Sequence, residues 1–199
     1  MSNILYIVVP CYNEQEVLPE TSKRLREKVQ TLRQSGKIDA DSRILFVNDG
    51  SKDATWEMIQ KLHEENSVFS GVNLSRNRGH QNALLAGIAV AVEHADMIVS
   101  MDADLQDDVD AMDRMIDAYE AGNDIVYGVR SSRQKDTFFK RNTAQLFYRM
   151  LHFLGAEIVY NRADYRLLSR RAAKGLLSFE EVNLFLRGIV PMVGYQSTT

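Results

Sequence analysis

Two carboxylates and a side-chain amide stand close together at Asp102, Asp104 and Gln106. The apolar run at residues 97–101 comes directly before them. Carboxylate and amide oxygens are the ligands that hard divalent cations such as Mg²⁺ and Mn²⁺ prefer, and these ions usually bind substrate phosphates as well. An Asp-x-Asp pair arises often by chance, so its meaning depends on where the fold places it.

Three further apolar runs end in polar residues. Glu14 follows the first run, Asp49 the second and Arg76 the third. Two of these residues could have a purely structural role instead of binding a ligand. Asp49 fits a turn or a helix cap, and Glu14 fits a helix N-terminus. Crowded carboxylates repel one another unless a cation or hydrogen-bond donors offset their charge. The joint pattern therefore predicts a site for a metal, for a ligand rich in hydroxyl and amide donors, or for both.

The elements that position these residues alternate between strands and helices. Strands are expected at 4–9, 43–48, 69–74, 96–101 and 124–129, and helices at 16–32, 54–65, 81–93 and 110–121. This order is typical of an α/β fold with a mostly parallel central sheet flanked by helices on both faces. Because ligands bind at the carboxyl ends of the strands in such sheets, the polar residues should meet at one edge.

The pattern changes after residue 129. A long helix rich in aromatic and basic residues is expected at 137–154, a short strand at 165–168, and helical stretches near 170–178 and 181–190. Residues 1–129 carry 12 Lys/Arg and 22 Asp/Glu, whereas residues 130–174 carry 11 and 3. Acidic residues can hold a metal and basic ones can face an anionic partner, although a solvated basic helix would show the same charges.

The bulk properties fit one globular domain over residues 1–199, with 45% hydrophobic residues and a net charge of −3. The single cysteine, Cys11, excludes an internal disulfide, and no apolar run is long enough to cross a bilayer. The dinucleotide and P-loop fingerprints are absent, and the four histidines lack the spacing of zinc ligands. We expect no nucleic-acid partner, and the sequence indicates no oligomeric state.

Several motifs resemble those of one enzyme family. They are Val-Val-Pro-Cys-Tyr-Asn-Glu at 8–14, Val-Asn-Asp-Gly-Ser-Lys-Asp at 47–53 and Met-Asp-Ala-Asp-Leu-Gln-Asp at 101–107. The chain resembles the family 2 inverting glycosyltransferases, which implies the nucleotide-diphospho-sugar transferase (GT-A) fold. The runs at 74–81, 128–130, 138–141 and 163–168 narrow the resemblance to the polyprenyl-phosphate glycosyltransferases, such as bactoprenol glucosyltransferases and dolichol-phosphate mannose synthases.

The resemblance implies a role for each matching residue. The residues that would bind the nucleotide sugar are Pro10, Tyr12, Glu14, Asp49, Arg76, Asp102, Ala103 and Asp104. The metal ligands would be Asp102, Asp104 and Gln106. The acceptor phosphate would be bound by Arg130, Lys140 and Arg141. Arg76 would face the pyrophosphate, with a salt bridge as the alternative. Asp164 and Arg130 would be the catalytic residues. Asp164 is the candidate if a base is used, with a salt bridge to Arg162 or Arg166 as the alternative.

The implied activity is that of a metal-dependent, inverting hexosyltransferase. It would move a sugar from a nucleotide sugar, with UDP-glucose favoured, to a polyprenyl phosphate such as undecaprenyl phosphate, for cell-surface glycan synthesis or modification. Mg²⁺ or Mn²⁺ would be the cofactor. Residues 1–129 would bind the donor. Residues 130–199 would bind the acceptor and the membrane surface at the cytoplasmic face of the cell membrane. Members of this group continue into membrane helices, so a soluble catalytic domain without its C-terminal anchor is expected.

Alternatives remain open at this point. The helix expected at 137–154 would face the membrane or pack on the core. A family 2 glycosyltransferase could also act on a growing polysaccharide or another non-lipid acceptor. A phosphohydrolase could use Asp102 and Asp104 as nucleophile and acid, although that chemistry usually places its pair on the first strand. A non-catalytic module could keep the fold alone.

Overall fold

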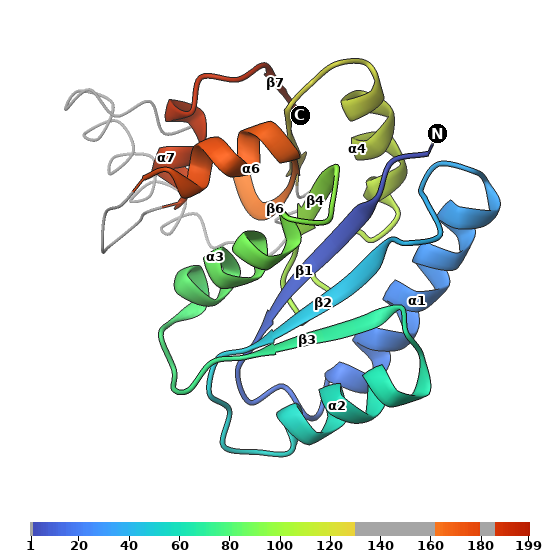
Figure 1. Cartoon of the computed structure of the whole chain (residues 1–199), viewed down its shortest axis with the longest axis vertical. Helices are drawn as coiled ribbons and strands as arrows, with labels where there is room; N and C mark the ends of the chain where they lie inside the picture. The colour runs from blue at the N-terminus through green and yellow to red at the C-terminus, as the bar shows by residue number, and fades with distance from the viewer. Residues whose placement is uncertain (1, 130–161, 180–185) are drawn as a thin grey trace, which may run out of the picture.

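The structure is a computed structural model that describes residues 2–129, 162–179 and 186–199 (Figure 1). Its elements, in chain order, are β1 (Leu5–Cys11), α1 (Leu18–Gln34), β2 (Arg43–Asn48), α2 (Thr55–Glu65), β3 (Phe69–Asn73), α3 (His80–Ala91), β4 (Met97–Ser100), α4 (Ala111–Glu120), β5 (Ile125–Val129), β6 (Arg162–Ser169), α6 (Arg170–Leu177), α7 (Leu186–Met192) and β7 (Ser197–Thr198). The alternation predicted for residues 1–129 is confirmed, and each expected boundary lies within two residues of the observed one. The helix expected at 137–154 lies outside the described residues.

Seven strands form one sheet in the order β3-β2-β1-β4-β6-β5-β7. β1 pairs in parallel with β2 and β4, β2 with β3, and β5 with β7, whereas β6 runs antiparallel to both β4 and β5. The mostly parallel sheet is therefore confirmed. The short strand expected at 165–168 is part of the longer β6, which separates β4 from β5. β7 was not predicted.

Helices cover both faces of the sheet (Figure 1). On one face, α1, α2 and α4 bury Leu25, Ile59 and Met112 together with alternate residues of β1 such as Ile7 and Val9. On the other face, α3, α6 and α7 pack on side chains that point the opposite way, including Val8 and Val47. This alternation along each strand follows from the two-residue repeat of a pleated strand. The result is a layered α/β fold with two apolar cores.

α3 lies against the middle of the sheet because its sequence, His-Gln-Asn-Ala-Leu-Leu-Ala-Gly-Ile-Ala-Val-Ala, is small and apolar. Gly87 makes the closest approach: a Cβ built there would lie 2.3 Å from Cγ1 of Val8 and 2.8 Å from Cγ2 of Val47. Glycine at this position therefore lets the helix axis come closer to the sheet than any other residue would. This packing fixes where the first residue of α3 stands.

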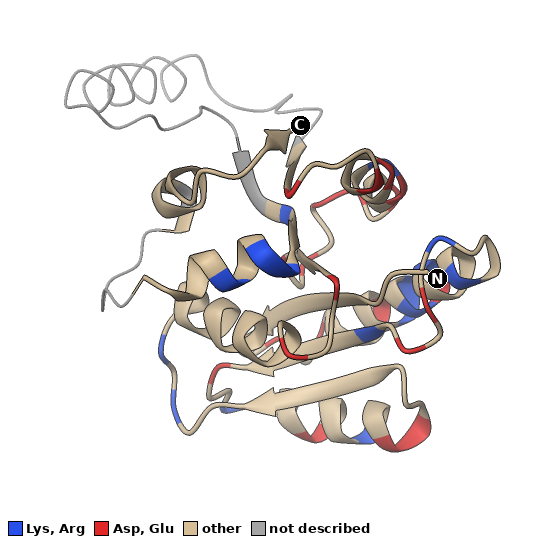
Figure 2. Ribbon diagram, turned by 45° about the horizontal axis from the view of Figure 1, so that its top comes forward, with Lys and Arg blue, Asp and Glu red and all other residues tan. Residues whose placement is uncertain are grey.

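Ion pairs join α1 and the turn after it to α4 and its N-terminal cap along one flank. The ammonium group of Lys28 pairs with Asp110 and Asp113, and that of Lys37 pairs with Asp117. Figure 2 shows acidic residues along α4 and basic residues along α1. Three of the acidic residues in 1–129 therefore have a structural use away from the site. None of the helices in the described ranges combines the length and the apolar character needed to cross a bilayer.

Candidate active site

The carboxyl ends of β1 and β4 border a polar hollow of about 270 Å³. Its lining consists of Pro10, Glu14, His80, Asp102, Ala103 and Asp104. Parallel pairing of β1 with β4 sets the two strand ends side by side, with Val8 opposite Ser100. The sheet therefore brings together five of the residues that the sequence proposed for nucleotide-sugar binding. No lysine or arginine is among the described residues that line the hollow.

The charges in this hollow are crowded. Burial raises the pKa of Glu14, and the negative charges of Asp104 and Asp102 raise it further. A carboxyl with a raised pKa marks a place where an added positive charge would stabilise the ionised form. A cation or a ligand rich in hydrogen-bond donors would therefore offset the negative charges of the hollow.

The turn that follows β4 holds Asp102 and Asp104 in a defined path. Oδ1 of Asp104 accepts a hydrogen bond from the backbone N–H of Gln106 at 3.1 Å, and Leu105 between them has a φ of 55°. The carbonyl of Ala103 accepts a hydrogen bond from the buried hydroxyl of Thr21 on α1 at 2.6 Å. The side chain of Gln106 is exposed and does not line the hollow. Its predicted role as a metal ligand stays a prediction.

Hydrogen bonds join the loop after β1 to the loop after β2. The backbone N–H of Asn13 donates to Oγ of Ser51 at 2.9 Å, and Oδ1 of Asn13 accepts from the N–H of Lys52 at 2.8 Å. The N–H of Glu14 donates to Oγ1 of Thr55 at 2.8 Å. Asn13 takes a left-handed backbone conformation with φ of 56° to make these contacts. These bonds hold the backbone of Glu14 at the edge of the hollow.

The side chain of Asp49 accepts hydrogen bonds from backbone N–H groups. It is 2% exposed, and its two carboxylate oxygens accept hydrogen bonds from the N–H groups of Arg78 at 2.6 Å and Gly79 at 2.9 Å. It therefore holds the loop between β3 and α3, which is a turn-stabilising role of the kind that the sequence allowed. Asp49 does not line the hollow, and contact with the nucleoside base stays a prediction.

His80 is the residue of the hollow that sequence reasoning missed. Its Nε2 lies 3.5 Å from Oδ1 of Asp102, although 22 positions separate the two residues in the chain. The spacing of the histidines excluded a zinc site and contained no information on their nearness to the strand ends. The available signal was its position, directly after a glycine in the segment that links a strand end to a helix.

The other proposed residues divide into two sets. Tyr12 and Arg76 are exposed and do not line the hollow. Arg130, Lys140 and Arg141 lie outside the described residues. Asp164 falls within β6, and the position of its side chain also lies outside the described part. Within the described ranges, no group of three or more His, Cys, Asp or Glu side chains is arranged to hold a metal.

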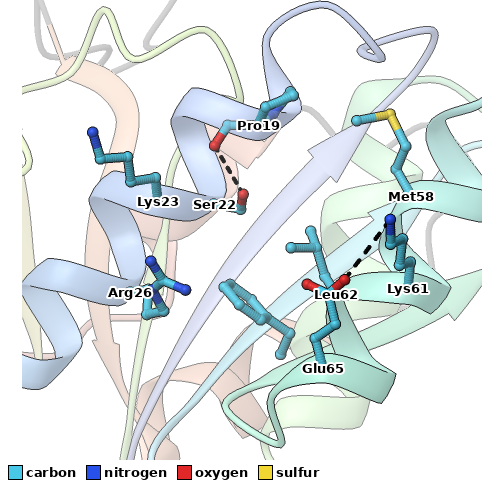
Figure 3. Close-up of a pocket in the computed structure, with 9 residues that line it drawn as sticks. Pro19, Ser22, Lys23, Arg26, Met58, Lys61, Leu62 and Glu65 are labelled. Atoms are coloured by element: carbon cyan, nitrogen blue, oxygen red, sulfur yellow. Dashed lines mark hydrogen bonds and ion pairs between the residues drawn. The ribbon is translucent and has the colours of Figure 1, made fainter.

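A second hollow of about 390 Å³ lies between α1 and α2 (Figure 3). Its floor is apolar, with Met58, Leu62 and Phe69, and Lys23 and Arg26 stand at its rim. None of the residues proposed for donor or metal binding lines it. The acidic hollow at the ends of β1 and β4 is therefore the better candidate for an active site.

The fold and the acidic strand ends define the class as GT-A glycosyltransferases. A mannosyltransferase of Pyrobaculum calidifontis, solved with GDP-Man and Mn²⁺, matches with a TM-score of 0.66 at 17% identity, covering 100% of this chain and 55% of that one. TarS of S. aureus, solved with UDP-GlcNAc, matches with a TM-score of 0.60 at 15% identity over 98% and 55% of the two chains. At these identities the likeness concerns the fold. The chain belongs to glycosyl transferase family 2, whose sequence model matches residues 6–177.

Curated relatives resemble the chain along almost its whole length. The uncharacterized glycosyltransferase YkoT of Bacillus subtilis is 50% identical over 98% of this chain and 58% of its own length. The bactoprenol glucosyl transferase of Shigella phage SfV is 36% identical over 96% of this chain and 60% of its own length. The chain thus spans about three fifths of the length of these relatives. The resemblance to family 2 glycosyltransferases inferred from the motifs is confirmed.

Proposed function

We propose that the chain carries the donor site of a metal-dependent, inverting glycosyltransferase that moves a sugar from a nucleotide sugar to a polyprenyl phosphate. The observation that carries this proposal is the hollow in which Glu14, Asp102 and Asp104 converge. The relatives named as bactoprenol glucosyl transferases support a lipid carrier as acceptor and glucose as the sugar. UDP-glucose is accordingly the donor to test first.

The residues present fit a divalent cation. The fit rests on the donor set: the carboxylates of Asp102 and Asp104 line the hollow with no lysine or arginine among the described lining residues, and a cation held by two carboxylates takes its remaining ligands from substrate phosphates and water. Asp102 and Asp104 would hold Mg²⁺ or Mn²⁺, with Gln106 as a third oxygen donor after a change of side-chain orientation. A cation bound there supplies Lewis-acid stabilisation of the leaving nucleoside diphosphate. Pro10, Tyr12 and Asp49 would contribute to nucleoside binding, and Arg76 to pyrophosphate binding.

The reaction is a single displacement at the anomeric carbon. An oxygen of the acceptor phosphate forms the new bond as the bond to the nucleoside diphosphate breaks, and the configuration inverts. A phosphate monoester has a second pKa of about 6, so it is largely dianionic at neutral pH and needs no base to remove a proton. Arg130, Lys140 and Arg141 would position this phosphate as charge-assisted donors. Asp164 is the candidate base if the monoanion reacts.

The basic segment at 130–174 supports an anionic acceptor at the cytoplasmic face of the cell membrane. A soluble polysaccharide acceptor would share the donor site and would have no use for this charge. Transfer of labelled glucose from UDP-glucose to undecaprenyl phosphate in vesicles separates the two. Lys140→Ala with Arg141→Ala should abolish transfer and leave UDP binding intact. Undiminished transfer by this double variant would rule out their role at the acceptor.

The donor site is tested by calorimetry with UDP and Mn²⁺. Asp104→Ala should abolish Mn²⁺-dependent UDP binding. Asp108→Ala is the matched control: its Oδ1 also accepts a backbone N–H two residues on, that of Asp110 at 3.0 Å, but it does not line the hollow. The control should bind as the wild type does. Absence of binding by the wild type, or equal loss in both variants, would refute the donor site.

A further inference from the structure

Among the described residues that line the hollow, His80 is the only one with a basic side chain. It is the first residue of α3, and its imidazole shares the hollow with Glu14, Asp102 and Asp104. Nε2 lies 3.5 Å from Oδ1 of Asp102, and the two side chains are 44% and 30% exposed. The imidazole is therefore close enough to the carboxylate of Asp102 to influence its orientation.

The backbone around His80 is held firmly. The two residues before it, Arg78 and Gly79, donate their N–H groups to the buried carboxylate of Asp49. The carbonyl of Arg78 accepts a hydrogen bond from Nδ2 of Asn82 at 2.7 Å. Gly79 itself has a φ of 86°, a conformation that suits glycine and turns the chain into α3.

The loop between β3 and α3 is also held where it passes over the turn after β2. A Cβ on Gly50 would lie 2.5 Å from both the carbonyl carbon of Arg76 and the backbone nitrogen of Asn77, so the loop passes directly over the turn after β2. α3 then rests on β1 and β2 through Gly87. Because both ends of its connection are anchored, His80 has a set position relative to Asp102.

A carboxylate that binds a cation needs a partner that fixes its orientation, and loss of such a partner commonly weakens metal binding about 10–100-fold. We propose that His80 is a positioning residue that orients the carboxylate of Asp102 for the complex of a nucleoside diphosphate with a divalent cation. This inference rests on the donor site proposed above. An N–H on Nε2 would donate toward Oδ1 of Asp102, and the contacts of Asp49 hold the backbone of the two residues before His80.

Three variants test the proposal in calorimetric titrations with UDP, with and without Mn²⁺. His80→Ala should weaken Mn²⁺-dependent binding of UDP about 10-fold or more and leave binding of UDP alone unchanged. His80→Gln, which keeps an N–H donor, should recover most of the affinity. His94→Ala is the control, because this exposed histidine stacks on Tyr6 away from the hollow. Because the side chain of His80 is 44% exposed, both His80 variants should melt at the wild-type temperature.

The outcomes separate this inference from the proposed function. No binding of UDP with Mn²⁺ by the wild type would refute the donor site itself. Binding by the wild type together with equal affinity of His80→Ala would overturn only the positioning role. An equal loss with and without Mn²⁺ would also overturn it, since that pattern reports direct contact with the nucleotide. A His80→Gln protein as weak as His80→Ala would exclude the N–H donor as the cause.

Discussion

Gly87→Ala gives a sharp test of the packing that places α3. In an open helix this change stabilises a protein by about 1 kcal/mol, because alanine has the higher helix propensity. Here the new Cβ would lie 2.3 Å from Val8 and 2.8 Å from Val47, and both valines are 0% exposed. Overpacking of a tight core costs about 1–3 kcal/mol, and two contacts this short with rigid side chains place the cost near the upper end. We expect a net loss of about 2 kcal/mol.

Urea unfolding followed by circular dichroism measures this loss. With a slope of about 2 kcal/mol per M, the midpoint should fall by about 1 M at unchanged slope. Val8→Ala removes the nearest methyl group, so Gly87→Ala should cost much less in that background. Ala89→Gly, at an exposed position of the same helix, should cost about 1 kcal/mol and calibrates the propensity. A Gly87→Ala protein more stable than the wild type would refute the close approach of α3 to the sheet.

Three further predictions concern other contacts, each measured by unfolding. Gly50→Ala should cost at least about 2 kcal/mol, because its φ is +65° and the backbone at Arg76 blocks a Cβ; wild-type stability would contradict that. Thr21→Val should cost about 1–3 kcal/mol, because the carbonyl of Ala103 loses its donor; no loss would exclude this bond. The Arg171 guanidinium lowers the pKa of Asp124 below its usual value of about 3.9. The stabilisation is therefore present above pH 4 or so and lost as the pH falls through the lowered pKa. Asp124→Asn should melt earlier than the wild type at pH 7, and the difference should shrink as the pH falls below about 4; a difference that does not change with pH would count against the ion pair.

The order of elements in residues 1–129 was predictable because each strand is an apolar run bounded by polar residues. Pairing partners were not, since periodicity within a segment contains no information on its neighbours. β6 illustrates this limit: its apolar residues predicted a strand, but not that it would separate β4 from β5 in antiparallel pairing. β7 has two residues, which is too short for any periodic signal.

The candidate site shows the same division between local and long-range information. Glu14, Asp102 and Asp104 were found because each follows an apolar strand, and all strand ends of a parallel sheet share an edge. His80 was missed because its nearness to Asp102 depends on the loop that Asp49 holds. For Asp49, an aspartate at this position was equally consistent with ligand binding and with stabilisation of a turn. Only the positions of the N–H groups of Arg78 and Gly79 reveal its use in the backbone.

The insertion of β6 beside β4 has a consequence for how the protein is made. β4 carries Asp102 at its end, and all four of its residues are buried. Until Arg162–Ser169 has left the ribosome, β4 has a partner on one side only and presents a bare apolar edge. Such edges recruit strands from other chains. Nascent chains from which β4 has emerged but β6 has not should therefore be the aggregation-prone species during synthesis, with the edge of β4 unprotected.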